Sequence, residues 1–280
     1  MTNQSIVVAD GTKLHTVFMP SKEGVAKYPL ATILWIHGFG EHIGRYERHF
    51  QYFSDFGYNS IGFDLRGHGR SSGARAYINR FEEYLDDVLA VYQHYKENLA
   101  TPVFLVGHSM GGLILIRFLQ LHGEEIPYKT AVASSPLLGI KMKVPAWKDF
   151  LGNLAAKIYP KLSIPSGLDP TYISHDQAVV SQYIQDNLVL KIATAGWFSE
   201  IKKHLPLAHQ EARAIPRNFH ILMAGNDQLV DTNATKEFYK KLDPSIEKSL
   251  TVYEGWYHEI FNEPERQKAL QQLHLLLQTT

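Results

Sequence analysis

The chain has 280 residues, a length that suits one large α/β domain or a domain with an insertion. Its 28 Lys and Arg residues balance 28 Asp and Glu residues, which argues against a nucleic-acid-binding protein, because such proteins usually carry a basic excess. The chain has no cysteine, which excludes disulfides, thiolate metal sites and a cysteine nucleophile. We find no signal-peptide pattern and no apolar window of about 18 residues, so we expect a cytoplasmic protein without a membrane span.

Apolar runs alternate with helical patterns along most of the chain. A hairpin is expected over 5–18, with its turn at Asp10 and Gly11. Further strands are expected at 31–36, 58–64, 103–106, 130–134, 219–224 and 249–253. Helices are expected at 45–56, 81–97, 112–121 and 233–242, with a last helix from about 264 to 278 that starts at Pro264. This alternation is typical of a mostly parallel sheet with right-handed crossovers and helices on both faces.

The stretch 137–212 interrupts the alternation. It is helix-like, is broken by several prolines, and lies between two expected core strands. An insertion after the C-terminal end of a strand projects over the edge of the sheet where open α/β folds bind ligands. We therefore predict an α/β core formed by 1–136 and 213–280, with a helical cap at 137–212. The alternative is a structural subdomain that does not touch a substrate.

The most informative motif is the hexapeptide Gly107–Gly112, which lies between an apolar strand pattern and an apolar helix pattern. It places Ser109 at the apex of a strand–turn–helix unit, with a glycine two residues away on either side. This G-x-S-x-G spacing suits a nucleophile on a strained turn, where larger side chains would collide. The start of the helix also directs backbone N–H groups toward a developing negative charge. We predict that Ser109 is a nucleophile.

A serine nucleophile needs a base, and the base needs an orienting partner. In folds with this motif the acid and the histidine follow the serine in that order, each after a later strand. Asp227 follows the expected strand at 219–224, and His258 follows the last one. We predict that His258 is the general base and then the general acid, and that Asp227 orients it. Asp231 is the competing acid, although we expect it to cap the helix that begins near residue 233.

A tetrahedral intermediate requires two N–H donors for its oxyanion. We expect one donor to be the backbone N–H of Met110, directly after the nucleophile, and the other to be that of Phe39 in the glycine-rich loop 37–40. The alternative for this loop is a plain turn.

The remaining histidines do not predict a metal site. His37 and His68 lie in glycine-rich loops, where we expect them to bond backbone groups, and His108 is expected to pack within the turn. The chain has no H-E-x-x-H or comparable ligand spacing. Because a serine, a histidine, an aspartate and two backbone donors suffice for hydrolysis, we expect no metal and no cofactor.

Residues 141–162 have an amphipathic pattern. The side chains of Trp147, Phe150, Leu151 and Leu154 share one helix face, and five lysines decorate the rest of the segment. We predict that these four apolar residues line an acyl-binding wall or face a membrane surface, since basic amphipathic helices bind anionic membranes. The alternative is a cap helix that packs on the core while its lysines are solvated.

Together these motifs resemble the monoglyceride lipase and lysophospholipase group of the α/β-hydrolases over nearly the whole chain. The segments that carry the resemblance are His37–His42 with Arg45–Tyr46, Asp64–Ser71, Gly107–Gly112, Asp227–Asp231, and Gly255–Glu259 with Asn262–Glu263. The resemblance implies the α/β-hydrolase fold with a cap, and it implies Phe39 and Met110 as the oxyanion donors.

We therefore expect a serine carboxylester hydrolase that cleaves a single-acyl lipid ester through an acyl-enzyme, with a monoacylglycerol as the first-choice substrate. The alternatives are a lysophospholipase, a general carboxylesterase, a serine aminopeptidase or amidase, and a non-catalytic binding protein on a hydrolase fold. The intact set Ser109, Asp227 and His258 argues against the last of these. The expected partner is a small lipid ester rather than nucleic acid, and peripheral membrane contact through the cap is an open alternative.

Overall fold

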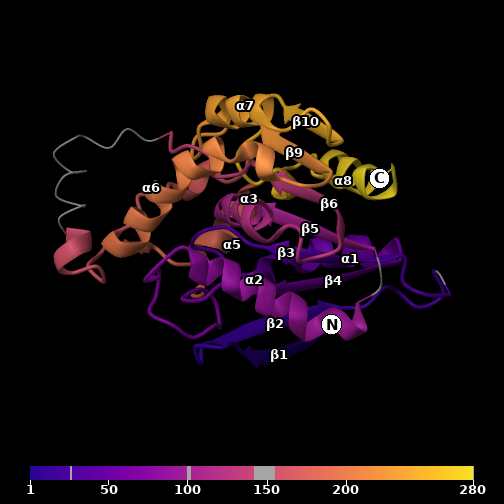
Figure 1. Cartoon of the computed structure of the whole chain (residues 1–280), viewed down its shortest axis with the longest axis horizontal. Helices are drawn as coiled ribbons and strands as arrows, with labels where there is room; N and C mark the ends of the chain where they lie inside the picture. Colours follow the sequence, from indigo (N-terminus) through magenta and orange to yellow (C-terminus); the bar gives the residue numbers. More distant parts are fainter. Residues whose placement is uncertain (26, 100–101, 142–154, 280) are drawn as a thin grey trace.

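The computed structural model describes residues 1–25, 27–99, 102–141 and 155–279 (Figure 1). Its centre is an eight-stranded sheet in the order β1-β2-β4-β3-β5-β6-β9-β10. The strands are β1 Thr2–Val7, β2 Lys13–Met19, β3 Ala31–Ile36, β4 Tyr58–Phe63, β5 Val103–His108, β6 Tyr128–Ser134, β9 Phe219–Ala224 and β10 Lys248–Tyr253. The strand β2 is antiparallel to both of its neighbours, and the other pairs are parallel. The predicted fold class, a mostly parallel sheet surrounded by helices, is confirmed.

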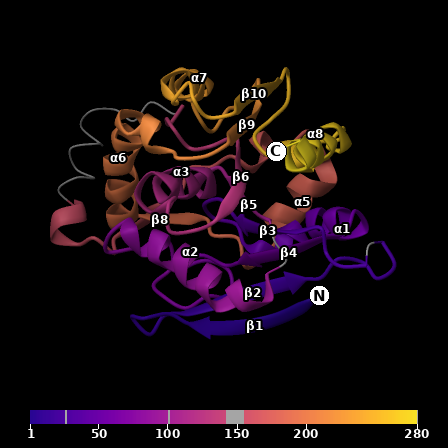
Figure 2. The same ribbon diagram turned by 45° about the vertical axis from the view of Figure 1, so that its right-hand side comes forward.

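Helices cover both faces of the sheet (Figure 2). They are α1 Glu47–Asp55, α2 Glu82–Tyr95, α3 Met110–His122, α7 Thr232–Lys241 and α8 Gln267–Thr279. The buried side chains of α1 and α8 belong to one hydrophobic cluster, and those of α2, α3 and α7 belong to another. Strand β3 contributes to both clusters, because Ile33 and Trp35 join the first and Leu34 and Ile36 join the second. This double burial explains why β3 is apolar at nearly every position.

The inserted stretch contains α5 Gln177–Gln185, α6 Ala195–Gln210 and a short antiparallel pair, β7 Ser163–Pro165 with β8 Ile192–Thr194. The insertion, which the sequence predicts as helix-like, therefore also contains a short strand pair. Pro165 has no backbone N–H and a fixed φ, so it favours the end of a two-stranded ribbon over a helix interior. Thr194 ends β8 and starts α6, since its side chain accepts a hydrogen bond from the Trp197 N–H.

Element boundaries differ from the sequence-based expectations at a few positions. A 3₁₀ turn at Ile43–Tyr46 precedes α1, so the α-helix itself begins at Glu47. The last helix begins at Gln267 instead of Pro264, because the residues between them form a turn in which the Arg266 N–H bonds the Glu263 carbonyl. Such differences are usual at helix ends, which fray and often form 3₁₀ turns.

Candidate active site

Ser109 occupies the turn between β5 and α3 and has φ 54° and ψ −118°. This backbone conformation is strained for a residue with a side chain, and it occurs at functional turns. The flanking glycines are required by close backbone contacts. A Cβ on Gly107 would lie 2.4 Å from the Gly111 carbonyl oxygen, and a Cβ on Gly111 would lie 2.2 Å from the carbonyl oxygen of Ile36. The local sequence thus forces the sharp turn that presents the Ser109 hydroxyl.

Asp227 and His258 meet at the same edge of the sheet. Each follows the C-terminal end of its strand, β9 for Asp227 and β10 for His258. The His258 Nδ1 atom lies 2.6 Å from the Asp227 Oδ2 atom, and both side chains are buried. The other carboxylate oxygen of Asp227 accepts hydrogen bonds from the N–H groups of Leu229 and Val230. The carboxylate is therefore held from both sides.

The two buried groups shift each other's pKa. Burial alone would lower the pKa of His258, but the charge of Asp227 and its hydrogen bond raise that pKa above the ordinary value. Burial alone would raise the pKa of Asp227, but His258 and the two backbone N–H groups lower it. Asp227 therefore stays ionised, so His258 donates its Nδ1–H to Asp227 and leaves Nε2 free for proton transfer.

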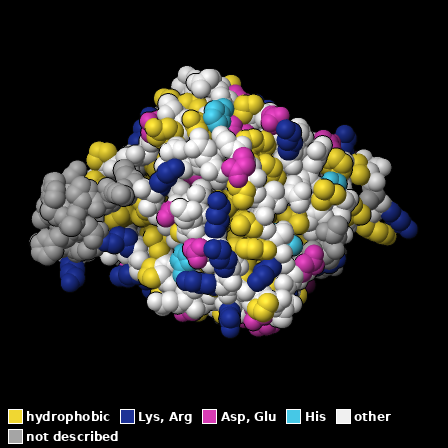
Figure 3. Space-filling view, turned by 90° about the horizontal axis from the view of Figure 1, so that it is seen from above, with side chains coloured by type: hydrophobic (Ala, Val, Ile, Leu, Met, Phe, Trp, Pro, Cys, Tyr) yellow, Lys and Arg dark blue, Asp and Glu magenta, His cyan; other side chains and the backbone are white. Residues whose placement is uncertain are grey.

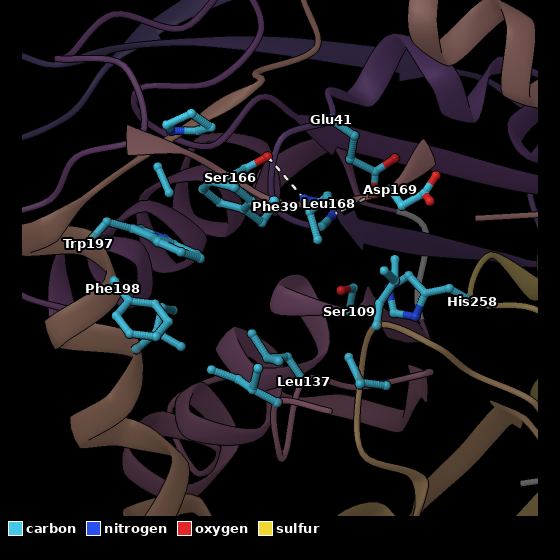
Figure 4. A pocket seen from close by; sticks show the side chains of 18 of the residues that line it. Phe39, Glu41, Ser109, Leu137, Ser166, Leu168, Asp169, Trp197, Phe198 and His258 are labelled. Atoms are coloured by element: carbon cyan, nitrogen blue, oxygen red, sulfur yellow. Dashed lines mark hydrogen bonds between the residues drawn. The ribbon is translucent and has the colours of Figure 1, made fainter. Parts of the chain in front are cut away.

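Ser109 and His258 line one cavity of about 710 Å³. Figure 4 shows the Ser109 hydroxyl beside the His258 ring at the wall of this cavity. Between these two described side chains the structure has no direct hydrogen bond. Such bonds are often long without substrate and shorten in the substrate complex. The geometry brings the predicted serine, histidine and aspartate together.

The competing acid has another partner. The Asp231 carboxylate accepts a hydrogen bond of 2.9 Å from the Asn233 N–H and caps α7, as predicted. Lys141 also contacts the acid segment, because its ammonium group donates to the Asp227 backbone carbonyl at 2.5 Å. This contact to the backbone leaves both carboxylate oxygens of Asp227 with the partners described above.

The expected oxyanion donors lie in the two segments that follow β5 and β3. Met110 is the first residue of α3, so its N–H has no acceptor within the helix. Phe39 lies in the loop after β3, between two glycines. Among the described residues, neither N–H donates a hydrogen bond. The Gly38 N–H is bonded to the Glu41 carboxylate at 2.7 Å, and the Gly40 carbonyl accepts from the Leu190 N–H at 2.7 Å. The loop is thus fixed on both sides of Phe39.

A buried ionic network joins the Phe39 loop to the His258 loop. The Arg45 guanidinium makes two hydrogen bonds to the Glu259 carboxylate, at 2.7 and 2.8 Å, and one to Glu41 at 2.6 Å. Burial alone would raise the pKa of Glu259, but Arg45 lowers it to about 2. The Tyr46 hydroxyl adds a hydrogen bond of 2.9 Å to Glu41. The sequence alone did not indicate a role for these residues, although their charges beside the two loops were a visible signal.

The histidines expected to bond the backbone do so. The His37 Nε2 atom accepts from the Leu65 N–H at 2.9 Å, and the His68 Nδ1 atom lies 3.1 Å from the Arg66 carbonyl. Burial lowers the pKa of His37 to about 4 and that of His108 to about 3, so both rings are neutral near pH 7. Within the described residues, no group of three or more His, Cys, Asp or Glu side chains could hold a metal ion.

The cavity wall away from His258 is apolar. It includes the side chains of Leu137, Ile140, Trp197, Phe198 and Ile201 (Figure 4). Four further residues were expected to line an acyl site or a membrane surface, and they lie outside the described residues: Trp147, Phe150, Leu151 and Leu154. Trp197 and Phe198 also lie in the predicted insertion, but their positions in the sequence did not mark them as lining residues. In the described ranges, no helix combines the length and apolarity needed to cross a membrane.

A strained serine elbow at the edge of a mostly parallel sheet, facing a histidine–aspartate pair, defines an α/β-hydrolase. The family described as serine aminopeptidase, S33, matches residues 27–265. The chain belongs to this family, and within it to the monoglyceride lipase group.

Three relatives and one solved structure show how far the similarity extends. The phospholipase YtpA of Bacillus subtilis is 34% identical over 244 residues, which cover 86% of this chain and 93% of the relative. The monoglyceride lipase of Rattus norvegicus is 32% identical, covering 84% of this chain and 77% of the relative. An uncharacterized abhydrolase domain-containing protein of Dictyostelium discoideum is 34% identical over 84% of this chain, which spans 25% of that longer protein. The monoacylglycerol lipase structure from Paleococcus ferrophilus superposes with a TM-score of 0.84 at 27% identity, covering 94% of this chain and 98% of that one.

Proposed function

We propose that this protein hydrolyses the ester bond of monoacylglycerols, releasing a fatty acid and glycerol. The observation that carries the proposal is the cavity of about 710 Å³, whose volume suits a single lipid chain and whose wall is mostly apolar around Ser109. The names of the relatives, monoglyceride lipase and phospholipase, support a lipid ester hydrolase. In this proposal residues 137–212 act as the cap that closes the cavity.

In the proposed mechanism, the Ser109 Oγ attacks the ester carbonyl carbon while His258 Nε2 accepts the hydroxyl proton. The N–H groups of Phe39 and Met110 stabilise the oxyanion of the tetrahedral intermediate. The bond to the glycerol oxygen then breaks, and His258 donates its proton to that oxygen. Water, deprotonated by His258, attacks the acyl-Ser109 ester. The second intermediate collapses to a fatty acid while His258 returns its proton to the Ser109 Oγ, which restores the serine and the neutral histidine.

The charged residues that line the cavity favour a substrate with a neutral head group. The described lining contains the carboxylates of Glu41, Asp169 and Glu259 and no Lys or Arg. Glu41 and Glu259 share the buried Arg45 behind them, whereas Asp169 is exposed at the rim and has no ion pair among the described residues. A phosphate group would therefore enter without a cation to pair with, at a cost in desolvation. A glycerol hydroxyl can instead donate to these carboxylates.

The experiment compares substrates that differ only in the head group. Purified protein is incubated with 1-oleoylglycerol, with an oleoyl lysophosphatidylglycerol, whose phosphate carries no cation of its own, and with an oleoyl amide, and the released oleate is measured. We expect kcat/KM for the glycerol ester to exceed that for the lysophospholipid by at least about tenfold, which corresponds to about 1.4 kcal/mol. A faster lysophospholipid reaction would contradict the head-group assignment and leave the serine mechanism intact. A Ser109→Ala variant that is as active as the wild type would contradict the mechanism.

A second part of the proposal concerns contact with a lipid surface. On the described part of the insertion, Ile158 is 74% exposed, Tyr159 is 62% exposed, and Ile164 is 50% exposed. Lys157 and Lys161 lie in the same stretch of sequence. Figure 3 shows hydrophobic and basic side chains next to one another on the exposed surface. Exposed apolar side chains next to lysines fit the boundary of an anionic bilayer.

Vesicle sedimentation tests this surface. We expect binding to vesicles that contain an anionic phospholipid and weaker binding at high salt, because salt screens lysine attraction beyond about 10 Å at 0.1 M. The double variant Ile158→Ser and Tyr159→Ser should lose binding and keep activity on a dissolved short ester. Unchanged vesicle binding of this variant would contradict the assignment.

A further inference from the structure

The side chain of Trp197, in the first turn of α6, contacts both residues that the proposed mechanism uses as oxyanion donors. Its ring stacks on the Phe39 ring, with centroids 3.9 Å apart and planes at 27°. Its indole N–H donates a hydrogen bond of 3.3 Å to the Met110 sulfur. Figure 4 shows the Trp197 ring lying against Phe39 on the cavity wall. A residue of the insertion therefore touches both halves of the proposed oxyanion hole.

Phe39 depends on such a contact more than Met110 does. Met110 is held by α3, whereas Phe39 lies in a loop that is hydrogen-bonded at the neighbouring Gly38 and Gly40, so packing of its side chain decides how Phe39 itself is oriented. The Phe39 ring contacts two other rings, because it stacks on Trp197 and lies nearly perpendicular to His68, whose centroid is 5.5 Å away. Because these two contacts fix the position of the ring, they restrict the φ and ψ angles of Phe39 and hence the direction of its N–H.

Trp197 itself is anchored to the core. The backbone N–H of Trp197 donates to the Thr194 hydroxyl oxygen at 3.2 Å, and that hydroxyl donates to the Ala76 carbonyl at 2.6 Å. The side chain of Trp197 is only 7% exposed, so the surrounding packing fixes its rotamer. The chain of contacts from Ala76 through Thr194 and Trp197 to Phe39 links the α6 end of the insertion to the loop that carries the donor.

We propose that Trp197 is a positioning residue of the oxyanion hole, which is complete only when the start of α6 is docked on the core. The inference rests on the proposed function, because it assumes that the N–H groups of Phe39 and Met110 bind the oxyanion. Trp197 acts through Phe39 and Met110 and need not touch the reacting atoms. Displacement of α6 then weakens stabilisation of the intermediate as well as opening the cavity.

A short substrate separates this role from acyl binding. Acetate has only one methyl group to bury, so loss of the Trp197 wall costs little ground-state binding of p-nitrophenyl acetate. A misplaced donor lowers kcat, because the oxyanion forms only after the substrate is bound. Complete loss of one oxyanion donor costs about 10²–10³ in kcat, and misplacement costs less.

The variants are Trp197→Leu, Trp197→Phe, Met110→Leu and the double variant Trp197→Phe with Met110→Leu. Trp256→Phe is the matched control, since Trp256 stacks on Tyr253 and not on the cavity wall. We expect Trp197→Leu to lower kcat for p-nitrophenyl acetate by about tenfold, with KM within about twofold. Affinity for 1,1,1-trifluoroacetone, whose serine adduct carries an oxyanion, should fall by a similar factor.

The pair of milder variants tests the indole–sulfur contact. Trp197→Phe and Met110→Leu each remove it and keep the apolar volume, so we expect each to lower kcat by about threefold and the double variant to lower it no further. Additive losses would overturn the role of this contact. The midpoint of thermal unfolding is measured for every variant, so that a loss of fold is recognised.

The inference is overturned if Trp197→Leu keeps its kcat, or if only KM rises while the affinity for the ketone is unchanged. Those outcomes would make Trp197 a wall residue alone. The proposed function fails in a different way. A wild-type protein without esterase activity, or a Ser109→Ala variant as active as the wild type, would overturn the proposed function and this inference together.

Discussion

Replacement of Asp227 by Asn tests the pair at the centre of the proposed site. The two side chains have nearly the same shape, so Asn can still accept the hydrogen bonds from Leu229 and Val230. Its amide group, however, would face His258 Nδ1 as a donor where the carboxylate was an acceptor 2.6 Å away. His258 would then carry its proton on Nε2, where it cannot accept the proton of Ser109.

The expected loss is large. Holding the catalytic histidine in the wrong tautomer lowers kcat by about 10⁴, which corresponds to about 5.4 kcal/mol of transition-state free energy. The pH profile should change as well. The base acts when His258 is neutral, so wild-type kcat/KM rises with pH through the raised pKa of His258. Without the carboxylate, burial is the larger influence and lowers that pKa, so the residual activity should persist to lower pH.

The assay is hydrolysis of p-nitrophenyl butyrate from pH 5 to 9, with Asp231→Asn as the matched control. Asn is as good an N-cap as Asp, so the control should fold normally and remain within a few-fold of wild-type activity. The reasoning is refuted if Asp227→Asn keeps more than a tenth of wild-type kcat. It is also refuted if the acid limb of its pH profile moves upward, or if Asp231→Asn is the inactive variant.

Three other predictions follow from the same geometry. Ser109→Ala should lower kcat by about 10⁶ and abolish labelling by a fluorophosphonate without changing the unfolding midpoint, and labelling of another residue would place the nucleophile elsewhere. For p-nitrophenyl esters of increasing acyl length, wild-type kcat/KM should rise by up to about fourfold per methylene, because each methylene is buried in the cavity. Phe198→Ser should flatten that rise, and a uniform loss at every length would mean that Phe198 only supports the fold. Gly111→Ala should destabilise the protein by about 3 kcal/mol or more, because its Cβ would lie 2.2 Å from the Ile36 carbonyl oxygen, and an unchanged midpoint in thermal unfolding would contradict the tight elbow.

Features governed by short-range physics were readable in the sequence. The elbow needs small residues two positions before and after Ser109, and the close contacts of Gly107 and Gly111 show why. Buried strands such as β3 are apolar at successive positions because both faces of the sheet are covered. Ser109, Asp227 and His258 each follow a strand, and because parallel strands end at the same edge of the sheet, this placement predicts that the three residues meet. These signals depend on neighbours in sequence or on periodicity, so no long-range contact had to be known.

The sequence left open which distant side chains meet. Arg45 pairs with Glu259 across 214 positions, and either charge had many candidates among 28 basic and 28 acidic residues. Trp197 reaches Phe39 only because the insertion folds back so that α6 starts against the core. The β7–β8 pair was not predicted for the same reason, since Ile164 and Ala193 become partners only when the insertion folds back on itself. Which of many compatible pairs forms depends on packing of the whole chain, and packing is a property of the tertiary structure.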